Sequence, residues 1–593
     1  MPFTKKILFT MVFFFILAGC FFTLEGIFRL AGIGYPTQPF QRARFVPQYY
    51  KDNPNFTKKY YPSSPLSEPS VHFHNLFPTL KSPGTLRLFV VGGSTAQGFP
   101  YYPNHSFSKI IEKALETTGL YERVEVINLG FSALSSYYVA DVAPKLLRYQ
   151  PDALIIYAGQ NEYYGTLTSL EKPSWMQKLY LALKEWRIFQ WLFSLIETRK
   201  TLPDESLMSQ QFANKRIPAD RSLDDKIARD FIRNLQSVVK KYRFHRIPVF
   251  VYEPVANLID MPPFSSENES ELKTLLTPYR SLFTNPTLLA EKLSKENILD
   301  MLQARFPSNA HVLYLAGLKA KSEGKPFLEL LEKAKDNDTT PFRYRSPLQH
   351  ALRNFIENET NKGYLAFIPL QDIIINKRGS NSFDNSIFID HLHFNRTGQA
   401  LLAQTFCESW LTFTKANSNA FRQVAEFFTL SNEREEAIFM HPLYDFEAQG
   451  RIIGLLQKPP YSLMLFPYRP SFDLTKHPFA LTTPSSLLAL YSQTNTDDFT
   501  KIYFSYLYTN GLTLEIASLV NTIRWLSPSH PQSYYNVAIL LSSSNSFSES
   551  AAMAWLYAIL FSEKTNTTIL SNARGYFRLH KKEDILFKWR IKP

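Results

Sequence analysis

Short apolar runs that alternate with helical stretches constrain the fold of this chain most strongly. The runs "LRLFVVGG" (86–93), "VEVINLG" (124–130) and "PDALIIYAG" (151–159) each end in glycine, and segments with helical spacing lie between them. Mostly apolar runs of this length are typical of strands buried on both faces. Strands that alternate with helices predict a parallel sheet with right-handed crossovers. The sequence therefore predicts an α/β domain.

The strand–helix pattern is interrupted once and then resumes. It covers residues 84–264, gives way to helical spacing at 265–340, and returns at 341–412. We interpret the two outer segments as parts of one domain and the middle segment as a helical insertion. Residues 25–83 are rich in Pro, Tyr and Phe with few periodic signals, which predicts a stem laid on this domain.

Residues 413–593 have helical spacing punctuated by proline. Segments 502–531 and 534–563 overlay at an offset of about 34 residues, which aligns Ala517 with Ala551. This period resembles the tetratricopeptide repeat. Helix pairs of that kind stack into concave binding surfaces. A protein partner is therefore one expectation for this region, and a helical cap without a partner is the other.

The first residues predict a membrane anchor. Lys5 and Lys6 precede an apolar run from Ile7 to Leu24, and a helix of that length spans about 27 Å, close to the thickness of a bilayer core. The lysines favour a cytoplasmic N-terminus, which places the body on the extracytoplasmic side. Leu17-Ala18-Gly19-Cys20 also resembles a bacterial lipobox. Residues 1–24 are expected to be either a membrane anchor or a lipoprotein signal next to a lipidated Cys20.

The charge balance favours an anionic surface over nucleic acid. The chain has 65 basic and 52 acidic residues, a formal net charge of +13. No recognisable nucleic-acid-reading module accompanies these charges, so no nucleic-acid partner is expected. An anionic membrane or polymer nearby explains them better. The two cysteines, Cys20 and Cys407, lie far apart in contexts that predict no disulfide between them.

Small and polar residues follow the three predicted strands. Ser94 comes directly after the first, Gly130 ends the second, and Asn161 and Glu162 follow the third. The carboxyl ends of parallel strands lie along one edge of a sheet, where ligands bind. A serine there can act as a nucleophile if a base is near. We interpret Glu162 as an acid that positions the loop, with a substrate contact as the alternative.

The segment "SIFIDHLHFNRTG" (386–398) offers that base. Asp390 and His393 are three residues apart, so one imidazole nitrogen can meet the carboxylate while the other faces Ser94. This is the arrangement that acyl transfer requires. The predicted catalytic residues are Ser94, His393 and Asp390. The predicted oxyanion donors are the Ser94 amide, the Gly130 amide and the Asn161 side chain.

Other chemistries fit the same residues less well. His391 and His393, with Asp390 and the distant His72 and His74, could ligate zinc, but no third cluster with ligand spacing appears in the sequence. The glycines at 92, 93 and 98 could cradle a phosphate, but no lysine follows Gly98 as a P-loop requires. "GGSTA" also approaches the nucleophile elbow of α/β-hydrolases, whose serine follows several strands. No metal or cofactor is expected, and His391 is expected to be structural or superficial.

Ser94, Gly130, Asn161 and the Asp390/His393 pair resemble, in order and spacing, the four sequence blocks of the SGNH (GDSL-type) hydrolases. The resemblance covers residues 84–264 and 340–412, and implies a flavodoxin-like three-layer α/β/α sandwich with serine esterase, lipase or carbohydrate deacetylase activity. "NEYYG" (161–165) and "ANLIDMPPF" (256–264) are similar to a membrane-anchored branch with tetratricopeptide-like helices. One departure is Gly93, which stands where the family has aspartate.

These features together predict an exported, membrane-tethered serine esterase that works through an acyl-enzyme at Ser94. The expected substrate is an ester, mainly O-acetyl, on an envelope glycan or lipid. Two alternatives stay open at this point. An O-acyltransferase of the same fold would pass the acyl group to a sugar hydroxyl, and an inactive scaffold would bind a protein through its helical repeats. For an active enzyme, His393→Ala should abolish turnover and His391→Ala should largely spare it.

Overall fold

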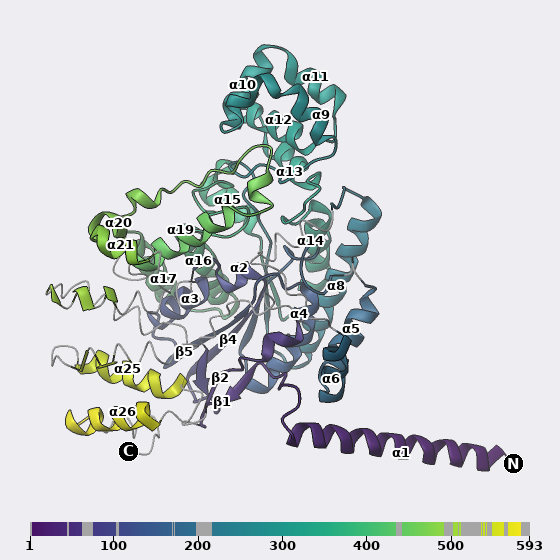
Figure 1. Cartoon of the computed structure of the whole chain (residues 1–593), viewed down its shortest axis with the longest axis vertical. Coiled ribbons are helices and arrows are strands. Elements are labelled where there is room, and N and C mark those ends of the chain that lie inside the picture. Colours follow the sequence, from purple (N-terminus) through teal and green to yellow (C-terminus); the bar gives the residue numbers. More distant parts are fainter. Residues whose placement is uncertain are drawn as a thin grey trace.

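The computed structural model describes residues 3–491 with gaps at 44–46, 62–74, 102–105, 169, 171, 197–215 and 434–441, and beyond them 548–561, 567–582 and parts of 502–510 and 535–542. Its centre is a parallel sheet with helices on both faces (Figure 1). The predicted repeat around Ala517 lies outside the described residues, as do His72 and His74.

The central sheet contains five parallel strands: β4 (Thr85–Gly92), β5 (Arg123–Gly130), β6 (Ala153–Tyr157), β7 (Val249–Tyr252) and β8 (Leu365–Ile368). They lie in the order β5-β4-β6-β7-β8. Counted along the chain this is 2-1-3-4-5, the order of the flavodoxin-like fold. Every residue of the central strands β4, β6 and β7 is buried, as the apolar runs require. The predicted fold class is confirmed.

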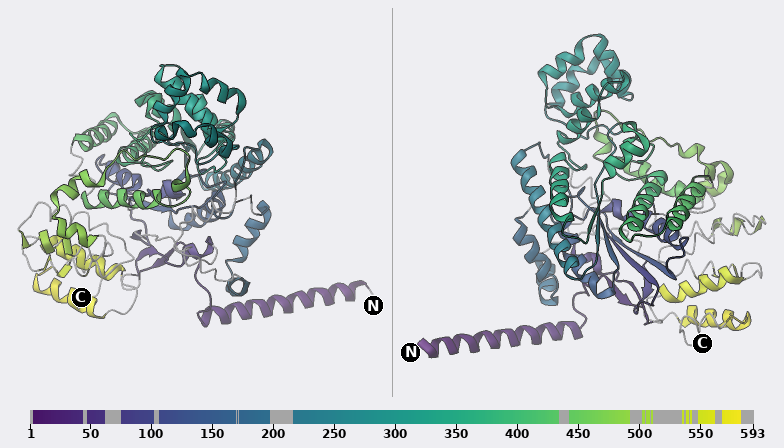
Figure 2. Two further views of the ribbon diagram at one scale, coloured as in Figure 1. Left: turned by 45° about the horizontal axis from the view of Figure 1, so that its top comes forward. Right: turned by 180° about the vertical axis from the view of Figure 1, so that it is seen from behind.

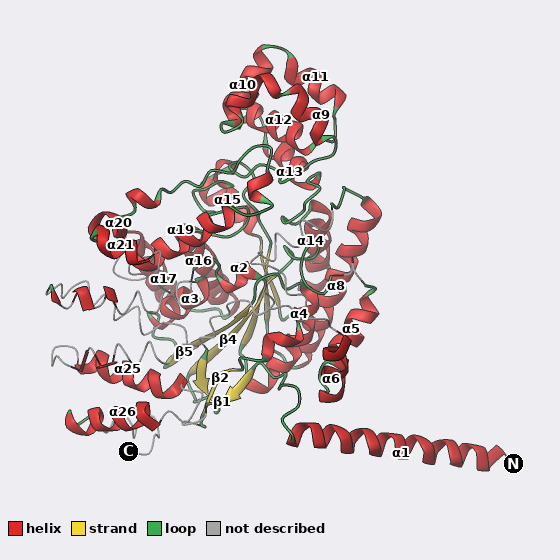
Figure 3. Ribbon diagram, viewed as in Figure 1, coloured by secondary structure: helices red, strands yellow, loops and turns green. Residues whose placement is uncertain are grey.

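Alternate residues of β4 face two separate cores, one on each side of the sheet. Leu88 and Val90 pack with α3 (Phe107–Glu116) and α16 (Arg396–Phe413). Phe89 and Val91 face the opposite core, which is formed with α4 (Ser136–Leu146), α8 (Arg221–Phe244) and α14 (Ser346–Thr360). Helix, sheet and helix therefore form three layers, visible by secondary-structure colour in Figure 3.

A group of short helices occupies the chain between β7 and β8: α9 (Glu269–Leu275), α10 (Pro286–Lys295), α11 (Ile298–Arg305), α12 (Ala310–Ser322) and α13 (Leu328–Asp336). They project beyond the sheet, at the top of Figure 1. After the last strand and α16 the described chain is helical. Its larger elements are α17 (Ser418–Glu433), α19 (Pro442–Leu456), α20 (Pro478–Thr482), α21 (Ser485–Tyr491), α25 (Ser548–Phe561) and α26 (Thr567–Leu579).

The segment that precedes the sheet has more structure than its sequence suggests. It contains a three-stranded antiparallel sheet of β1 (Phe40–Arg42), β2 (Tyr49–Asp52) and β3 (Leu76–Pro78). The ring of Phe40 packs against those of Phe77 and Tyr149, with centroids 4.9 and 5.1 Å apart. These rings belong to the same core as Phe89 of β4. Aromatic packing therefore attaches the segment before the sheet to the α/β domain.

The first helix, α1 (Phe3–Leu30), extends away from the body (Figure 2). Its segment Phe9–Leu30 contains an 18-residue window with a mean hydropathy of 2.2, of which 6% is buried. That length and composition suffice to cross a bilayer, which makes α1 compatible with the predicted anchor.

Candidate active site

The nucleophile candidate lies where the central strand becomes a helix. β4 ends at Gly92, and α2 (Ser94–Gln97) begins two residues later. Ser94 is the first residue of α2 and is partly exposed, whereas both of its neighbours are buried. Its backbone amide has no acceptor among the described residues. A partly exposed hydroxyl and an amide without an acceptor among the described residues therefore lie together at the carboxyl edge of the sheet.

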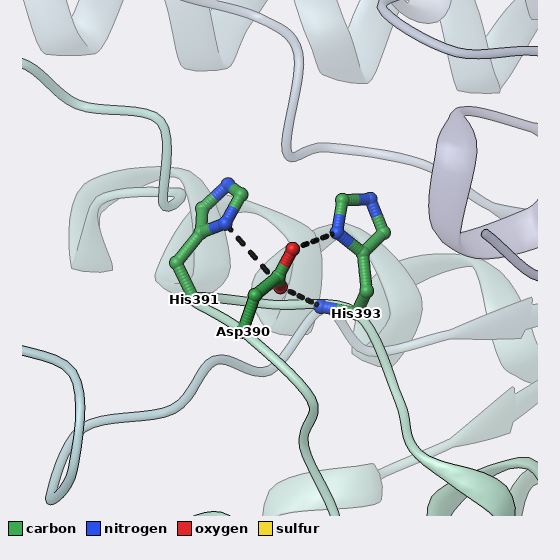
Figure 4. A group of neighbouring side chains, drawn as sticks. All are labelled: Asp390, His391 and His393. Carbon is green, nitrogen blue, oxygen red and sulfur yellow. Dashed lines mark hydrogen bonds and ion pairs between the residues drawn. The ribbon is translucent and has the colours of Figure 1, made fainter. Parts of the chain in front are cut away.

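A tight turn presents the histidine to this serine. The Asp390 Oδ1 atom accepts hydrogen bonds from the amides of Leu392 and His393 at 2.9 and 2.8 Å, and the Ile389 amide donates to the His393 carbonyl. The Asp390 Oδ2 atom lies 2.6 Å from His393 Nδ1, as Figure 4 shows. On the far side of the ring, His393 Nε2 lies 2.7 Å from Ser94 Oγ. Ser94 and His393, 299 positions apart in the chain, are thus joined by a hydrogen bond, and His393 is joined to Asp390 by another.

Electrostatics keeps the Asp390 carboxylate charged. Burial alone would raise its pKa, but attraction to His393 and His391 and hydrogen bonds from both lower the pKa well below its usual range. A carboxylate in this position holds the proton on His393 Nδ1 and leaves Nε2 free to accept the serine proton. The ring of Phe99 packs edge-on against His393, with centroids 4.7 Å apart, and partly covers it. No pattern in the sequence around Phe99 predicts this contact.

The Gly130 amide does not fit the predicted oxyanion role. It donates a 2.7 Å hydrogen bond to the Asn128 side chain, so it is not free for a developing oxyanion. A Cβ atom at Gly130 would collide with the backbone of Gln97 in α2. We therefore correct the prediction: this glycine lets strand β5 and helix α2 approach each other.

Ala133, three residues after Gly130, is the candidate donor that we put in its place. It has a φ of +60°, in the left-handed region that alanine seldom adopts, and it is partly exposed. Its carbonyl accepts the Thr166 amide at 2.7 Å, while its own amide has no acceptor among the described residues. A strained backbone with a free amide beside a nucleophile is a common feature of functional sites.

Asn161 lies between Ala133 and the nucleophile loop. Its Nδ2 donates to the carbonyl of Leu134, the residue after Ala133, at 3.1 Å. A Cβ atom at Gly93 would collide with the same Nδ2, so the absence of a side chain at position 93 makes room for the amide. Asn161 thus contacts both the nucleophile loop at Gly93 and the segment that follows Ala133.

Glu162 is buried and bonded to the protein itself. Its carboxylate accepts hydrogen bonds from the Ser136 amide at 2.7 Å and from the Ser136 hydroxyl at 2.8 Å. Burial raises its pKa to about 7, against the effect of these two hydrogen bonds. These contacts favour the loop-positioning role over its alternative, a substrate contact, because the carboxylate holds the first residue of α4.

His391 is buried as well, which fits the structural alternative of the prediction and not the superficial one. Its Nδ1 lies 2.6 Å from the Tyr461 hydroxyl and 3.3 Å from Asp390 Oδ1, and burial lowers its pKa. Asp390, His391 and His393 offer ligand atoms within 4.8 Å of one another. Hydrogen bonds to Tyr461, Ser94 and the turn amides already account for this grouping, so it needs no ion to explain it.

Structural comparison finds esterases among solved structures. The acetyl xylan esterase AlAXEase has 12% identity and a TM-score of 0.26, over 54% of this chain and 98% of that one. The lipase/acylhydrolase from Enterococcus faecalis has 12% identity and a TM-score of 0.25, over 54% and 93%. A two-domain esterase active on acetylated mannans has 12% identity and a TM-score of 0.24, over 56% and 50%. No protein-family model matches the sequence, and no curated protein is similar to it.

Proposed function

We propose that this chain is a serine esterase that forms an acyl-enzyme at Ser94. The observation that carries the proposal is the unbroken line from Ser94 Oγ through both nitrogens of His393 to the buried carboxylate of Asp390. A base within hydrogen-bond reach of a partly exposed hydroxyl, itself oriented by a third group, is the arrangement of an activated nucleophile. The free amides beside it supply the second requirement, a place for negative charge.

The geometry supports the following reaction. His393 Nε2 takes the Ser94 proton as Oγ attacks the ester carbonyl, and Asp390 stabilises the resulting imidazolium. The amides of Ser94 and Ala133 and the Asn161 side chain donate to the tetrahedral oxyanion. The same imidazolium then protonates the departing alkoxide. Water, deprotonated by His393, attacks the acyl-enzyme in the second half and releases the acid.

We further propose that the enzyme is tethered to a membrane with its body on the extracytoplasmic side. The exposed apolar helix α1 and the lysines at its start support this orientation. An ester, mainly O-acetyl, on an envelope glycan or lipid is the substrate we expect at that location. Transfer to a sugar hydroxyl would use the same acyl-enzyme, and the product formed with an added sugar acceptor distinguishes that activity from hydrolysis.

A fluorophosphonate probe tests the proposal directly, because it labels an activated serine covalently. The full chain should be labelled, and Ser94→Ala should not. Ser132→Ala is the matched control: Ser132 is also partly exposed, and it donates to the Gln97 side chain next to the site, so this variant should label like the wild type. A folded wild-type chain that resists labelling would overturn the assignment and favour a scaffold role. Labelling that survives Ser94→Ala would overturn it in favour of another nucleophile.

A further inference from the structure

A pair of helices beside α1 exposes apolar side chains on one face. They are α5 (Ser174–Leu183) and α6 (Arg187–Ile196). In α5, Trp175 and Leu179 are four residues apart, and in α6 Trp191 and Leu195 repeat the same spacing, so each pair forms a stripe along its helix. Trp175 is 64% and Leu195 63% exposed. Met176 and Leu192 are exposed next to the stripes. We call these six side chains the α5–α6 face.

The α5–α6 face is fastened to the end of the anchor helix. The Glu25 carboxylate of α1 accepts hydrogen bonds from the amides of Arg187 and Ile188, the first two residues of α6, at 3.1 and 3.2 Å. Aromatic rings add to this contact: Phe21 lies 5.1 Å from Trp186, the residue before α6, and Phe28 lies 5.7 Å from Trp191 of α6, between centroids. The position of the α5–α6 face is therefore fixed relative to the point where the apolar run of α1 ends.

Both views of the ribbon show α1 leaving the molecule on the side where α5, α6 and α8 lie (Figures 1 and 2). A bilayer crossed by α1 would stand on that side of the domain. Exposed basic side chains occur on the same helices: Lys178 of α5, and Arg229, Arg233, Lys240 and Lys241 of α8. Tryptophan with apolar side chains, flanked by lysine and arginine, is the composition of helices that lie in a lipid headgroup region.

We propose that the α5–α6 face lies in the headgroup region of the bilayer that α1 crosses. The inference rests on the proposed membrane anchoring and adds to it a second, lateral contact. The occupant is an anionic phospholipid surface, because exposed lysine and arginine side chains occur on α5 and on α8, on the side of the domain from which α1 leaves. Two contacts, one across the bilayer and one along its surface, would stop the catalytic domain from rotating freely about α1 and would fix the direction in which the Ser94 edge faces.

Site-directed spin labels on the full chain test this contact. The chain is placed in nanodiscs of equal parts phosphatidylcholine and phosphatidylglycerol, with Cys20→Ala and Cys407→Ala as the background. Single labels are attached through Leu179→Cys and Leu195→Cys, and their collision rates with oxygen and with a water-soluble nickel chelate are compared. A lipid-facing label meets oxygen and is protected from nickel. We expect this pattern at both positions.

Two further labels make every outcome decisive. Leu288→Cys, on α10 of the insertion, is 46% exposed, close to the 48% of Leu179, and should meet nickel freely. Phe13→Cys, in the middle of α1, should show the deepest lipid signal. If Leu179→Cys and Leu195→Cys behave like Leu288→Cys while Phe13→Cys reports lipid, the surface contact is wrong and the anchor stands. If they are shielded from both reagents, protein covers the face and the proposal is also wrong.

The remaining outcome concerns the anchor itself. A Phe13→Cys label that meets nickel freely would overturn the anchoring proposal and this inference together. Neither result touches the esterase assignment, because probe labelling at Ser94 is measured separately on the same samples. One charged variant gives a last measurement. Trp191→Glu should expose the Leu195→Cys spin label to the nickel chelate in water and should leave fluorophosphonate labelling of Ser94 unchanged.

Discussion

The hydroxyl of Tyr461 lies 2.6 Å from Nδ1 of His391, whose ring lies 3.3 Å from the carboxylate that holds His393. Tyr461 belongs to a short 3-10 helix, η6 (Tyr461–Leu463), in the helical region that follows the α/β domain. A second tyrosine from that region, Tyr468, donates to the Ile389 carbonyl at 2.9 Å. The region after α16 therefore packs directly on the turn that carries Asp390 and His393.

This contact changes the expectation for His391. Removing the ring by His391→Ala leaves a buried hydroxyl without its partner and opens a space beside Asp390, so we expect kcat to fall at least tenfold. Tyr461→Phe removes one hydrogen bond of about 1 kcal/mol, which corresponds to roughly a fivefold lower kcat if the bond positions Asp390. Steady-state hydrolysis of a chromogenic acetate ester gives kcat and KM for both variants.

A matched control separates positioning from general stability. Tyr468→Phe removes the contacts of the hydroxyl with the Ile389 carbonyl and with Asn385 Oδ1, neither of which reaches His391 or the Asp390 carboxylate. It should lower the unfolding temperature about as much as Tyr461→Phe and leave kcat nearly unchanged. Equal effects of the two variants on kcat would show that Tyr461 supports the fold and not the orientation of Asp390.

Asp390→Asn tests the proposed role of the carboxylate. An amide at this position no longer stabilises an imidazolium and can hold the wrong tautomer of His393, so kcat should fall by roughly 10⁴ while KM changes little. Probe labelling of Ser94 should slow in parallel. His393→Ala should abolish turnover altogether. An Asp390→Asn enzyme with nearly normal kcat would contradict the assigned triad.

The oxyanion assignment makes a prediction about position 93. Asn161→Ala removes a donor and should lower kcat by about 10²- to 10³-fold. Gly93→Ala adds a methyl group that collides with Asn161 Nδ2, so it should displace that donor and lower kcat in the same direction by a smaller factor. In the double variant the second change should add little, because both act on one group. Fully additive losses would place Gly93 and Asn161 in separate roles.

The local sequence carried enough information for the sheet and for the meeting of Ser94 with His393. Apolar runs that end in small residues specify buried parallel strands, and strand ends converge at one edge regardless of their distance along the chain. The oxyanion donors depend on finer geometry. Gly130 was a reasonable choice by position, but the side chain of Asn128, two residues away, takes its amide. The left-handed backbone of Ala133 leaves no mark in the composition of "FSALSS" (131–136).

Contacts between distant segments could not be predicted either, because the composition of a short segment does not show which residues it meets in the folded chain. Tyr461 meets His391 across 70 residues, and nothing in "PPYSLM" (459–464) distinguishes that tyrosine from the 31 others in the chain. The stem sheet could not be predicted because its strands are only three or four residues long. An alternation of apolar and polar residues cannot be recognised over so few positions. Glu162 was placed correctly at a strand end, but only the structure shows that its carboxylate points at Ser136.

The buried carboxyl of Glu162 makes the stability of the domain depend on pH. Its pKa is about 7 in the folded protein and near the ordinary 4.5 when unfolded. The folded state therefore binds this proton more tightly, and the protonated carboxyl adds to the free energy of unfolding. This contribution is complete below pH 4.5 and is lost as pH rises toward 7. Linkage gives about 1.4 kcal/mol per pH unit in that window, or roughly 3 kcal/mol in all.

Glu162→Gln tests this dependence, because glutamine can keep both contacts with Ser136 and does not titrate. Thermal unfolding of the full chain in detergent, measured at pH 5, 6, 7 and 8, should show the variant gaining stability relative to the wild type up to pH 7, by about 2–4 °C for every kcal/mol, and little more at pH 8. Glu357→Gln changes an exposed acid on α14 and should follow the wild type throughout. Parallel curves for Glu162→Gln and the wild type would mean that Glu162 titrates alike in the folded and unfolded chain, and would remove it as the source of the slope.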